Sequence, residues 1–163
     1  GLPFLTHLLS RIKAAGIDAV VLGTPFQAHV FSEYYGDGSE LGLRLRYVTE
    51  EAPLGTGGAI RNVLGELTAD TILVFNGDVL GGTDVRQVLD THRTSGADVT
   101  MHLVRVSDPR AFGCVPTDDT GRVTDFLEKT QDPPTDQINA GAYVFRRSVI
   151  EAIPAGRPVS VER

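Results

Sequence analysis

The sequence predicts an α/β fold in which a parallel half is followed by a more antiparallel, β-rich segment. Up to about residue 106, helical and strand-like patterns alternate, which is the rhythm of βαβ units. The run 71–75 (Thr-Ile-Leu-Val-Phe) is almost continuously apolar, as is typical of a strand buried on both faces. Beyond it the rhythm changes, because short strand-like segments at 113–116, 123–128 and 141–145 are joined by turns and not by helices.

Hydrophobic spacing and glycine stops predict the individual elements. In the first segment Leu5, Leu8 and Ile12 fall on one helical face, and Gly16 supplies the stop. Gly96 ends a later helix in the same way. We expect helices at 3–15, 25–35, 57–67 and 85–95, strands at 18–23, 43–49, 71–75 and 99–106, a hairpin turn at 118–121 and a rigid loop at 132–136.

Composition predicts a single globular domain, residues 1–163, that works on small molecules. The chain is 41% hydrophobic and 22% charged, and its net charge of -6 disfavours nucleic acids and anionic membranes as partners. It has no apolar run of roughly 18–20 residues that could span a membrane. Cys114 is the only cysteine, so we expect no intrachain disulfide and a cytoplasmic location. The start at Gly1 resembles the middle of an element, so we expect a partial chain.

A glycine-rich segment, 50–59 (Glu-Glu-Ala-Pro-Leu-Gly-Thr-Gly-Gly-Ala), links a strand to a helix. Glycines let backbone N–H groups approach a ligand, and a helix N-terminus favours polar or anionic groups. A dinucleotide fingerprint would require glycine at Ile60, and no Gly-Lys-Ser/Thr follows to form a phosphate loop. The segment therefore predicts a ligand contact of another kind, with a plain helix start as the alternative.

Asn76-Gly77-Asp78 follows the most apolar strand. Ligands of open α/β sheets bind beyond the carboxyl ends of strands, and Mg²⁺ prefers a few carboxylate oxygens together with water and phosphate. Asp78 is therefore a candidate Mg²⁺ ligand. The alternative is a carboxylate that caps the next segment.

Two further pairs carry groups suited to a sugar phosphate. Lys129 could hold a phosphate as a point charge, and Glu128 could accept hydrogen bonds from hydroxyls. Asn139 offers a donor and an acceptor, and Gly141 allows a close approach. An exposed ion pair and a plain turn before a strand are the respective alternatives.

Other kinds of site find little support. The histidines stand at positions 7, 29, 92 and 102, and no two of them have metal-ligand spacing. No Gly-x-Ser-x-Gly elbow is present, and Cys114 has no obvious histidine partner. These observations disfavour a histidine-bound metal centre and a nucleophilic hydrolase.

The order of the motifs is more specific than any of them alone. The segments 54–59, 75–78, 126–129 and 138–145, in this order, resemble the nucleotide-sugar pyrophosphorylases, which are sugar-phosphate nucleotidyltransferases. Within that family, the sequences of these motifs are most similar to those of the mannose-1-phosphate guanylyltransferases. The resemblance implies a three-layer α/β/α, Rossmann-like nucleotidyltransferase fold with a mixed central sheet. It also implies that residues 1–163 lack the signature loop at the N-terminal end and the C-terminal part of the catalytic domain.

The resemblance further implies an activity. A sugar 1-phosphate would attack the α-phosphorus of a nucleoside triphosphate and release pyrophosphate, most simply mannose 1-phosphate and GTP giving GDP-mannose. By similarity, the nucleotide would contact Glu50, Gly55, Thr56 and Gly57. Asp78 would bind Mg²⁺, and Lys129 would neutralise the sugar phosphate, so these two are the expected catalytic residues. The sugar would be lined by Gly113, Glu128, Asn139 and Gly141.

The departures from the family leave other functions open. The signature loop with its arginine, the lysine that follows it and a second metal-binding aspartate are not found, and Thr130 replaces a common proline. We therefore expect the 163-residue chain alone to have little or no activity. The alternatives are a glucose-1-phosphate uridylyl- or thymidylyltransferase and a non-catalytic, sugar-nucleotide-binding regulatory subunit. Homo-oligomerisation is left open.

Overall fold

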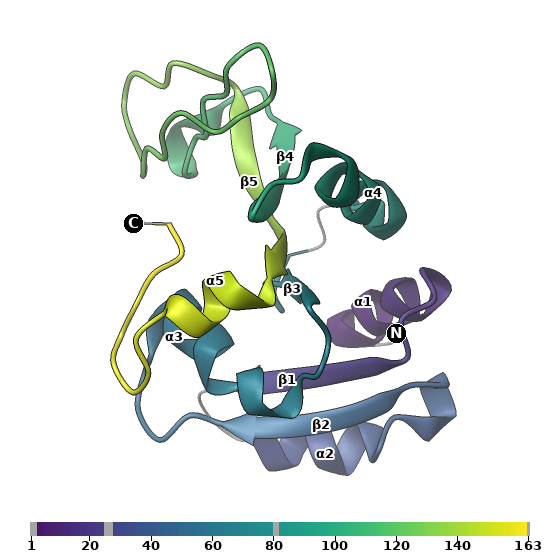
Figure 1. Ribbon diagram of the computed structural model, residues 1–163. Coiled ribbons are helices and arrows are strands. Elements are labelled where there is room, and N and C mark those ends of the chain that lie inside the picture. The colour runs from purple at the N-terminus through teal and green to yellow at the C-terminus, as the bar shows by residue number, and fades with distance from the viewer. Residues whose placement is uncertain (1–2, 25–27, 80–81, 163) are drawn as a thin grey trace.

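The computed structural model describes residues 3–24, 28–79 and 82–162, and Figure 1 shows helices and strands alternating along them. The helices are α1 (Phe4–Ala14), α2 (Ala28–Tyr35), α3 (Gly55–Asn62), α4 (Val85–Ser95) and α5 (Arg147–Ala152), with short 3-10 helices η1 (Ser39–Leu41), η2 (Leu64–Glu66) and η3 (Pro109–Ala111). The strands are β1 (Ala19–Thr24), β2 (Arg44–Thr49), β3 (Thr71–Phe75), β4 (Val99–Arg105) and β5 (Gln137–Arg146). None of the helices in these ranges is long and apolar enough to cross a membrane.

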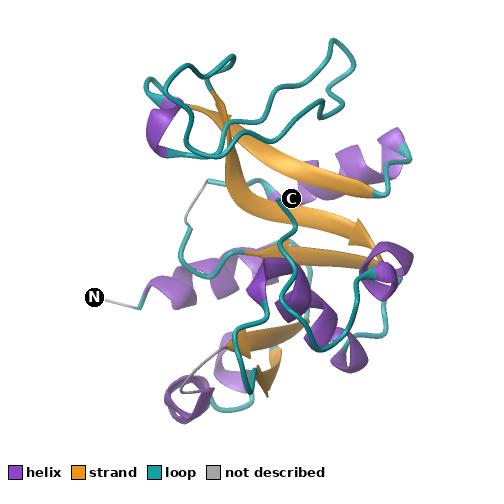
Figure 2. Ribbon diagram, turned by 90° about the vertical axis from the view of Figure 1, so that its left-hand side faces the viewer, coloured by secondary structure: helices purple, strands orange, loops and turns teal. Residues whose placement is uncertain are grey.

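The strands of the described residues form two sheets. β1 and β2 pair in parallel, from Ala19 opposite Arg44 to Thr24 opposite Thr49, and a parallel pair needs a long connection such as α2. The second sheet is antiparallel, in the order β3-β5-β4 (Figure 2). The predicted α/β fold with parallel and antiparallel pairing is confirmed, but the central sheet is divided into these two groups of strands.

Helical segments cover both faces of the parallel sheet, which gives the predicted layers. Successive strand residues point to opposite faces. On one face of β2, Leu45 packs in a cluster with Leu9 of α1 and Tyr35 of α2. On the other face Arg46 pairs with Glu66 of η2 at 2.6 Å.

Several predicted elements are confirmed and others are wrong in extent. β3 and α4 begin and end as predicted, whereas the helix predicted at 57–67 runs from Gly55 to Asn62 and then tightens into η2. The strand predicted at 141–145 is part of the ten-residue β5. The start of the helix predicted at 25–35 lies at residues 25–27, outside the described residues.

The strands predicted at 113–116 and 123–128 are wrong, because these segments form only isolated bridges. Cys114 pairs with Leu127, and Thr117 pairs with Val123. Between these bridges Pro116 has no N–H group to donate, so the ladder cannot continue. The hairpin turn predicted at 118–121 is confirmed, since the N–H of Asp118 donates to the carbonyl of Arg122 at 2.9 Å.

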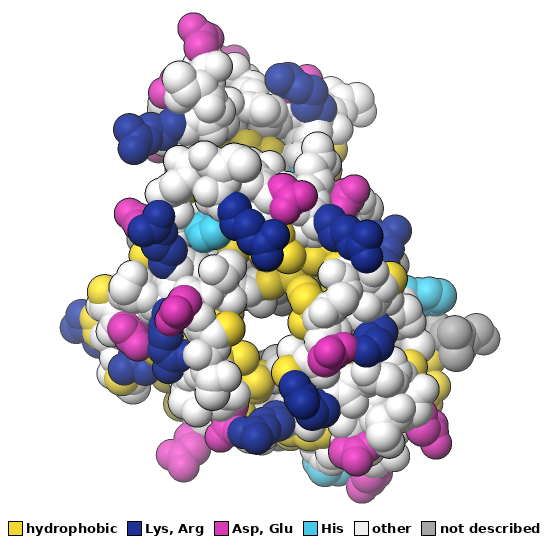
Figure 3. Space-filling model, turned by 45° about the vertical axis from the view of Figure 1, so that its right-hand side comes forward, with side chains coloured by type: hydrophobic (Ala, Val, Ile, Leu, Met, Phe, Trp, Pro, Cys, Tyr) yellow, Lys and Arg dark blue, Asp and Glu magenta, His cyan; other side chains and the backbone are white. Residues whose placement is uncertain are grey.

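Among the described residues, a cluster of buried hydrophobic side chains lies beside each sheet. Leu9, Leu43 and Leu45 form the cluster beside the parallel sheet. The cluster beside the antiparallel sheet contains Ile60, Leu64, Ile72, Tyr143, Phe145 and Ile150. Figure 3 shows hydrophobic side chains gathered around an opening in the lower half of the molecule. Each sheet is therefore backed by a hydrophobic cluster of its own in the described part of the chain.

A buried histidine on α4 makes stability depend on pH. His92 is 5% exposed, and its Nδ1 lies 2.9 Å from Oγ1 of Thr100. Burial lowers the pKa of His92 below its ordinary value of 6.5, and the charge of Arg146 lowers it further. The unfolded chain therefore binds this proton more readily, so the contribution to stability is complete above the ordinary value and is lost as the pH falls below it.

We expect the urea midpoint of unfolding to fall between about pH 7 and about pH 5, and part of that fall to be absent in His92→Gln. His7→Gln, which removes an exposed histidine, is the matched control and should keep the full pH dependence. An unchanged pH dependence in His92→Gln would contradict this expectation.

Candidate active site

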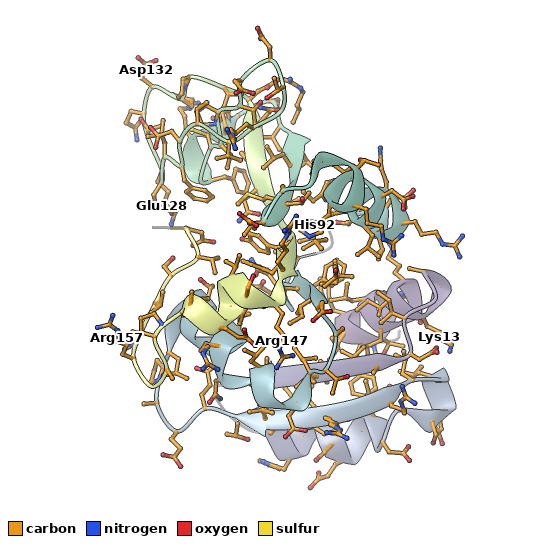
Figure 4. All side chains as sticks on the ribbon, viewed as in Figure 1. Lys13, His92, Glu128, Asp132, Arg147 and Arg157 are labelled. Carbon is orange, nitrogen blue, oxygen red and sulfur yellow. The ribbon has the colours of Figure 1, made fainter. Side chains whose placement is uncertain are left out.

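Three parts of the chain lie against β5 or α3, the elements that carry Asn139, Gly141 and the glycine-rich segment. They are the turn after β3, the irregular segment 106–136 above the antiparallel sheet in Figure 1, and the segment after α5 that runs back along α3. In Figure 4, Glu128 points downward from the irregular segment, whereas Arg157 lies on the returning segment. The tertiary fold thus brings together residues that are as many as 105 positions apart, such as Thr56 and Val161.

The turn that carries Asp78 is anchored to β5. The N–H of Asn76 donates to the carbonyl of Gly141 at 2.8 Å, directly beyond the last β3–β5 pair. The N–H of Val79 reaches the carbonyl of Asn76 at 3.4 Å and closes the turn. Asp78 is exposed at its tip, and no described residue donates a hydrogen bond to its carboxylate. This carboxylate is consequently available to a cation.

The donor set suits one protein ligand of a Mg²⁺ ion. A solvent-accessible carboxylate on a turn is the kind of hard oxygen that Mg²⁺ takes together with water and substrate phosphate. The described residues contain no group of three or more metal-ligating side chains. Asp78 therefore fits the ion as a single ligand, and substrate oxygens would have to supply others.

Gly113, Glu128 and Asn139 are brought together. The carbonyl of Gly113 accepts the N–H of Asn139 at 3.4 Å. A Cβ atom at Gly113 would lie 2.8 Å from the ring of Phe126 and 3.3 Å from Oε2 of Glu128. A side chain at position 113 would thus fill the space against Glu128. The contact of these residues with a sugar stays a prediction, but their proximity is the arrangement that a sugar pocket needs.

Lys129 has an unusual backbone. Its φ of 36° lies in the left-handed region, and it is the only such non-glycine residue in the described part of the chain. A side chain in that region is strained, and such strain gathers at functional positions. Glycine would adopt this conformation with less steric strain, so the presence of lysine supports a role for its exposed ammonium group.

Gly141 lies at an irregularity in β5. The β4–β5 register shifts between Met101, opposite Tyr143, and Leu103, opposite Asn139, and Gly141 has a φ of +69°. A Cβ atom there would lie 3.1 Å from Cβ of Asn76. The close approach that this glycine permits is therefore that of the Asn76 turn, and an approach of the sugar stays a prediction.

The glycine-rich segment is covered by the chain itself. The carbonyl of Val159 accepts the N–H groups of Gly57 at 2.8 Å and of Gly58 at 3.2 Å, and Oγ1 of Thr56 accepts the N–H of Val161 at 3.1 Å. Within the described residues, the N–H groups of Gly55 and Thr56 remain without an acceptor. Only this first turn of α3 still offers donors to a nucleotide.

Glu50 is a buried carboxylate at the end of β2. It is 9% exposed, and its Oε2 accepts the N–H of Leu54 at 3.1 Å. Its backbone N–H donates to the carbonyl of Thr24, at the end of β1. Oε2 therefore shapes the loop before α3, while Oε1 has no donor from the described residues and can accept from a base.

Sequence reasoning missed two residues that join the parts of the site. They are Asn76, whose N–H donates to Gly141, and Tyr143, and neither has a role predicted from sequence. The phenol of Tyr143 accepts a hydrogen bond from Nδ2 of Asn139. Strand spacing could have revealed Tyr143, because every second residue of a strand points to the same face and residues 139, 141 and 143 follow that spacing.

Comparisons with known proteins identify relatives of the whole chain. The family model described as nucleotidyl transferase matches residues 1–158. A mannose-1-phosphate guanylyltransferase of Mycobacterium tuberculosis is 69% identical over 163 residues, which are 100% of this chain and 45% of that protein. A D-glycero-alpha-D-manno-heptose 1-phosphate guanylyltransferase of Aneurinibacillus thermoaerophilus is 31% identical, over 99% of this chain and 69% of the relative.

Solved structures similar to this chain are found as well. The crystal structure of HddC from Yersinia pseudotuberculosis superimposes with a TM-score of 0.84 and 26% identity, over 99% of this chain and 70% of that one. A second structure of HddC, complexed with GMP-PN, gives a TM-score of 0.83. The chain spans less than half the length of the mycobacterial relative but most of the length of HddC.

Proposed function

Because the chain belongs to the nucleotidyl transferase family, we propose that the protein makes an NDP-sugar and pyrophosphate from a nucleoside triphosphate and a sugar 1-phosphate. The proposed substrates are GTP and mannose 1-phosphate, and the product is GDP-mannose. The relative that is 69% identical over every residue of the chain supports this choice. A cytoplasmic location, expected from the single cysteine, is part of the proposal.

One geometric observation carries the proposal. The hydrogen bond from Asn76 to Gly141 holds the Asp78 turn against β5, next to Asn139. Asn139 in turn bonds Gly113, which adjoins Glu128. A carboxylate suited to a phosphate-bound cation and polar groups suited to a sugar therefore lie beside the same strand, β5. A sugar 1-phosphate needs both kinds of group a few ångströms apart.

The reaction needs positioning more than acid–base chemistry. An oxygen of the sugar phosphate forms a bond to the α-phosphorus, and the bond from that phosphorus to the bridging oxygen of pyrophosphate breaks. The departing pyrophosphate keeps the electron pair. Correct alignment and charge neutralisation supply most of the rate enhancement in such transfers. This requirement matches a site that offers polar contacts and no nucleophilic side chain.

The proposed roles follow from where the side chains lie. Lys129 would neutralise the phosphate of the sugar, with its strained backbone directing the ammonium group. Asp78 would hold Mg²⁺, which when bound neutralises charge on the phosphates. Glu128 and Asn139 would bind sugar hydroxyls. The N–H groups of Gly55 and Thr56 would face the nucleotide at the start of α3.

Glu50 is the proposed determinant of base choice. Guanine presents two donors on one edge, N1–H and the 2-amino group, and the free Oε1 of Glu50 can accept from them. In Glu50→Gln the amide oxygen can still accept the N–H of Leu54, but the amide nitrogen then faces the base as a donor. We therefore expect this variant to lose preference for GTP while it keeps the loop.

The test is pyrophosphate release by the protein expressed from its complete reading frame, with Mg²⁺ present. GTP with mannose 1-phosphate should give a kcat/KM at least about tenfold above UTP or dTTP with glucose 1-phosphate, since one mismatched donor–acceptor set costs that much or more. A higher value with UTP or dTTP would overturn the choice of substrates. Binding of GDP-mannose without any turnover would support a regulatory subunit instead.

A further inference from the structure

Tyr143 is a buried tyrosine of β5, the strand that also carries Asn139 and Gly141 of the candidate site. It is 1% exposed, and its ring belongs to the core cluster that contains Ile72 and Phe145. The rings of Tyr143 and Phe145 are 5.9 Å apart. The hydrophobic contacts fix the ring, so the phenol oxygen has a fixed position from which it can direct its neighbours.

The hydrogen bonds around Asn139 allow only one orientation of its amide. The N–H of Gly141 can only donate, and it donates to Oδ1 of Asn139 at 2.9 Å. Nδ2 must then face the phenol of Tyr143, which accepts from it. One bond thus uses the oxygen of the side-chain amide and the other uses its nitrogen. One N–H and one oxygen lone pair of this amide remain for a ligand. The phenol thus determines where the free N–H points.

The phenol also has a proton of its own to donate. Because its oxygen accepts from Asn139, its O–H points elsewhere. Burial raises the pKa of Tyr143, the bond from Asn139 opposes that rise, and the nearby charge of Glu162 adds to it. The ring lies between two other parts of the chain, because Val74 of β3 is the strand partner of Tyr143 and Val161 of the returning segment packs on the same cluster.

We propose that Tyr143 is a positioning residue for the sugar side of the active site, holding the amide of Asn139 in place next to Gly141 and the Asp78 turn. The inference rests on the proposed function for its substrate, a sugar 1-phosphate. Without the hydroxyl, the side-chain amide of Asn139 keeps only the bond from Gly141 and can swing away from the sugar. The ring of phenylalanine would keep the packing of the core.

The first experiment compares Tyr143→Phe with wild type in the complete protein. The KM for mannose 1-phosphate should rise about fivefold to tenfold, the usual effect of one lost buried hydrogen bond, while the KM for GTP and kcat change less than about twofold. Tyr47→Phe is the matched control, since it removes the phenol that donates to the carbonyl of Gly36 at 2.8 Å, away from the site. It should leave all three parameters unchanged. Equal changes in both KM values for Tyr143→Phe would overturn the proposal.

A double-mutant cycle tests whether Tyr143 acts through Asn139. In an Asn139→Ala background, Tyr143→Phe should no longer raise the KM for mannose 1-phosphate, because the amide that it positions is gone. A rise of the same size in that background would show that Tyr143 acts independently and would overturn the proposal.

A third readout does not depend on activity. The side-chain amide resonances of Asn139 in ¹⁵N NMR spectra should shift and broaden in Tyr143→Phe and stay unchanged in Tyr47→Phe. If wild type releases no pyrophosphate but these resonances respond as expected, the proposed function fails and the positioning role stands. Unchanged resonances in Tyr143→Phe would overturn the positioning role itself.

Discussion

Replacing Gly58 by alanine is expected to destabilise the chain by about 2 kcal/mol, although alanine is the better helix former. Gly58 lies inside α3, where alanine would normally raise stability. Here the added Cβ atom would lie 2.9 Å from the carbonyl oxygen of Arg157 and 2.9 Å from Cβ of Leu54. Both are main-chain-bound atoms that cannot rotate away, so the returning segment or α3 has to shift. Urea unfolding of the 163-residue chain measures the change.

Gly65→Ala is the matched control for this effect. Gly65 lies in η2 and is exposed, and a Cβ atom added there would meet no other atom within 4 Å. Its replacement should therefore leave stability within about 0.5 kcal/mol of wild type or raise it slightly. If Gly58→Ala proves as stable as Gly65→Ala, the returning segment does not pack on α3 as described.

Asp78→Asn is expected to lower kcat for pyrophosphate release by about 100-fold to 1,000-fold, the scale on which removal of one electrostatic group acts. The substitution keeps the shape of the side chain and removes the charge that would hold the cation. Because Asp78 is exposed and carries no hydrogen bond from the described residues, the stability of the fold should hardly change. The measurement is the initial rate as a function of Mg²⁺ concentration in the complete protein.

Asp119→Asn provides the control for charge alone. Asp119 is an exposed carboxylate in the hairpin turn, outside the candidate site, and its replacement should leave the rate and the Mg²⁺ dependence unchanged. The half-saturating Mg²⁺ concentration should rise strongly in Asp78→Asn only. An unchanged value in that variant would mean that other groups hold the cation and that Asp78 has no role as a ligand.

The local sequence was sufficient to predict an element where the residues that define its type and its ends lie within or next to it. β3 was predicted residue for residue because Thr71 and the four apolar residues after it are too short a run for a helix. α4 was predicted with Gly96 as its stop, and Gly96 takes the left-handed conformation there. Asp84, which the prediction did not use, caps the helix by accepting the N–H of Gln87. The residues of the candidate site could also be named from sequence, since their motifs are contiguous.

Local pattern failed where partners are distant. The segments at 113–116 and 123–128 have strand-like composition, but Pro116 interrupts their pairing and leaves single bridges. The irregularity in β5 at Gly141 depends on its neighbours β3 and β4, which no periodicity describes. The same is true of the division of the strands into two sheets.

The sequence by itself determined the class of fold, the order of the motifs and the chemical groups of the candidate site, because periodicity and side-chain chemistry are local properties. Only the tertiary structure decided which groups meet. It placed Val159 on the N–H groups of Gly57 and Gly58, and it placed the phenol of Tyr143 against Asn139. The residues in these contacts are neighbours only because of packing and strand register. Packing and register depend on residues throughout the chain, so no local segment determines them.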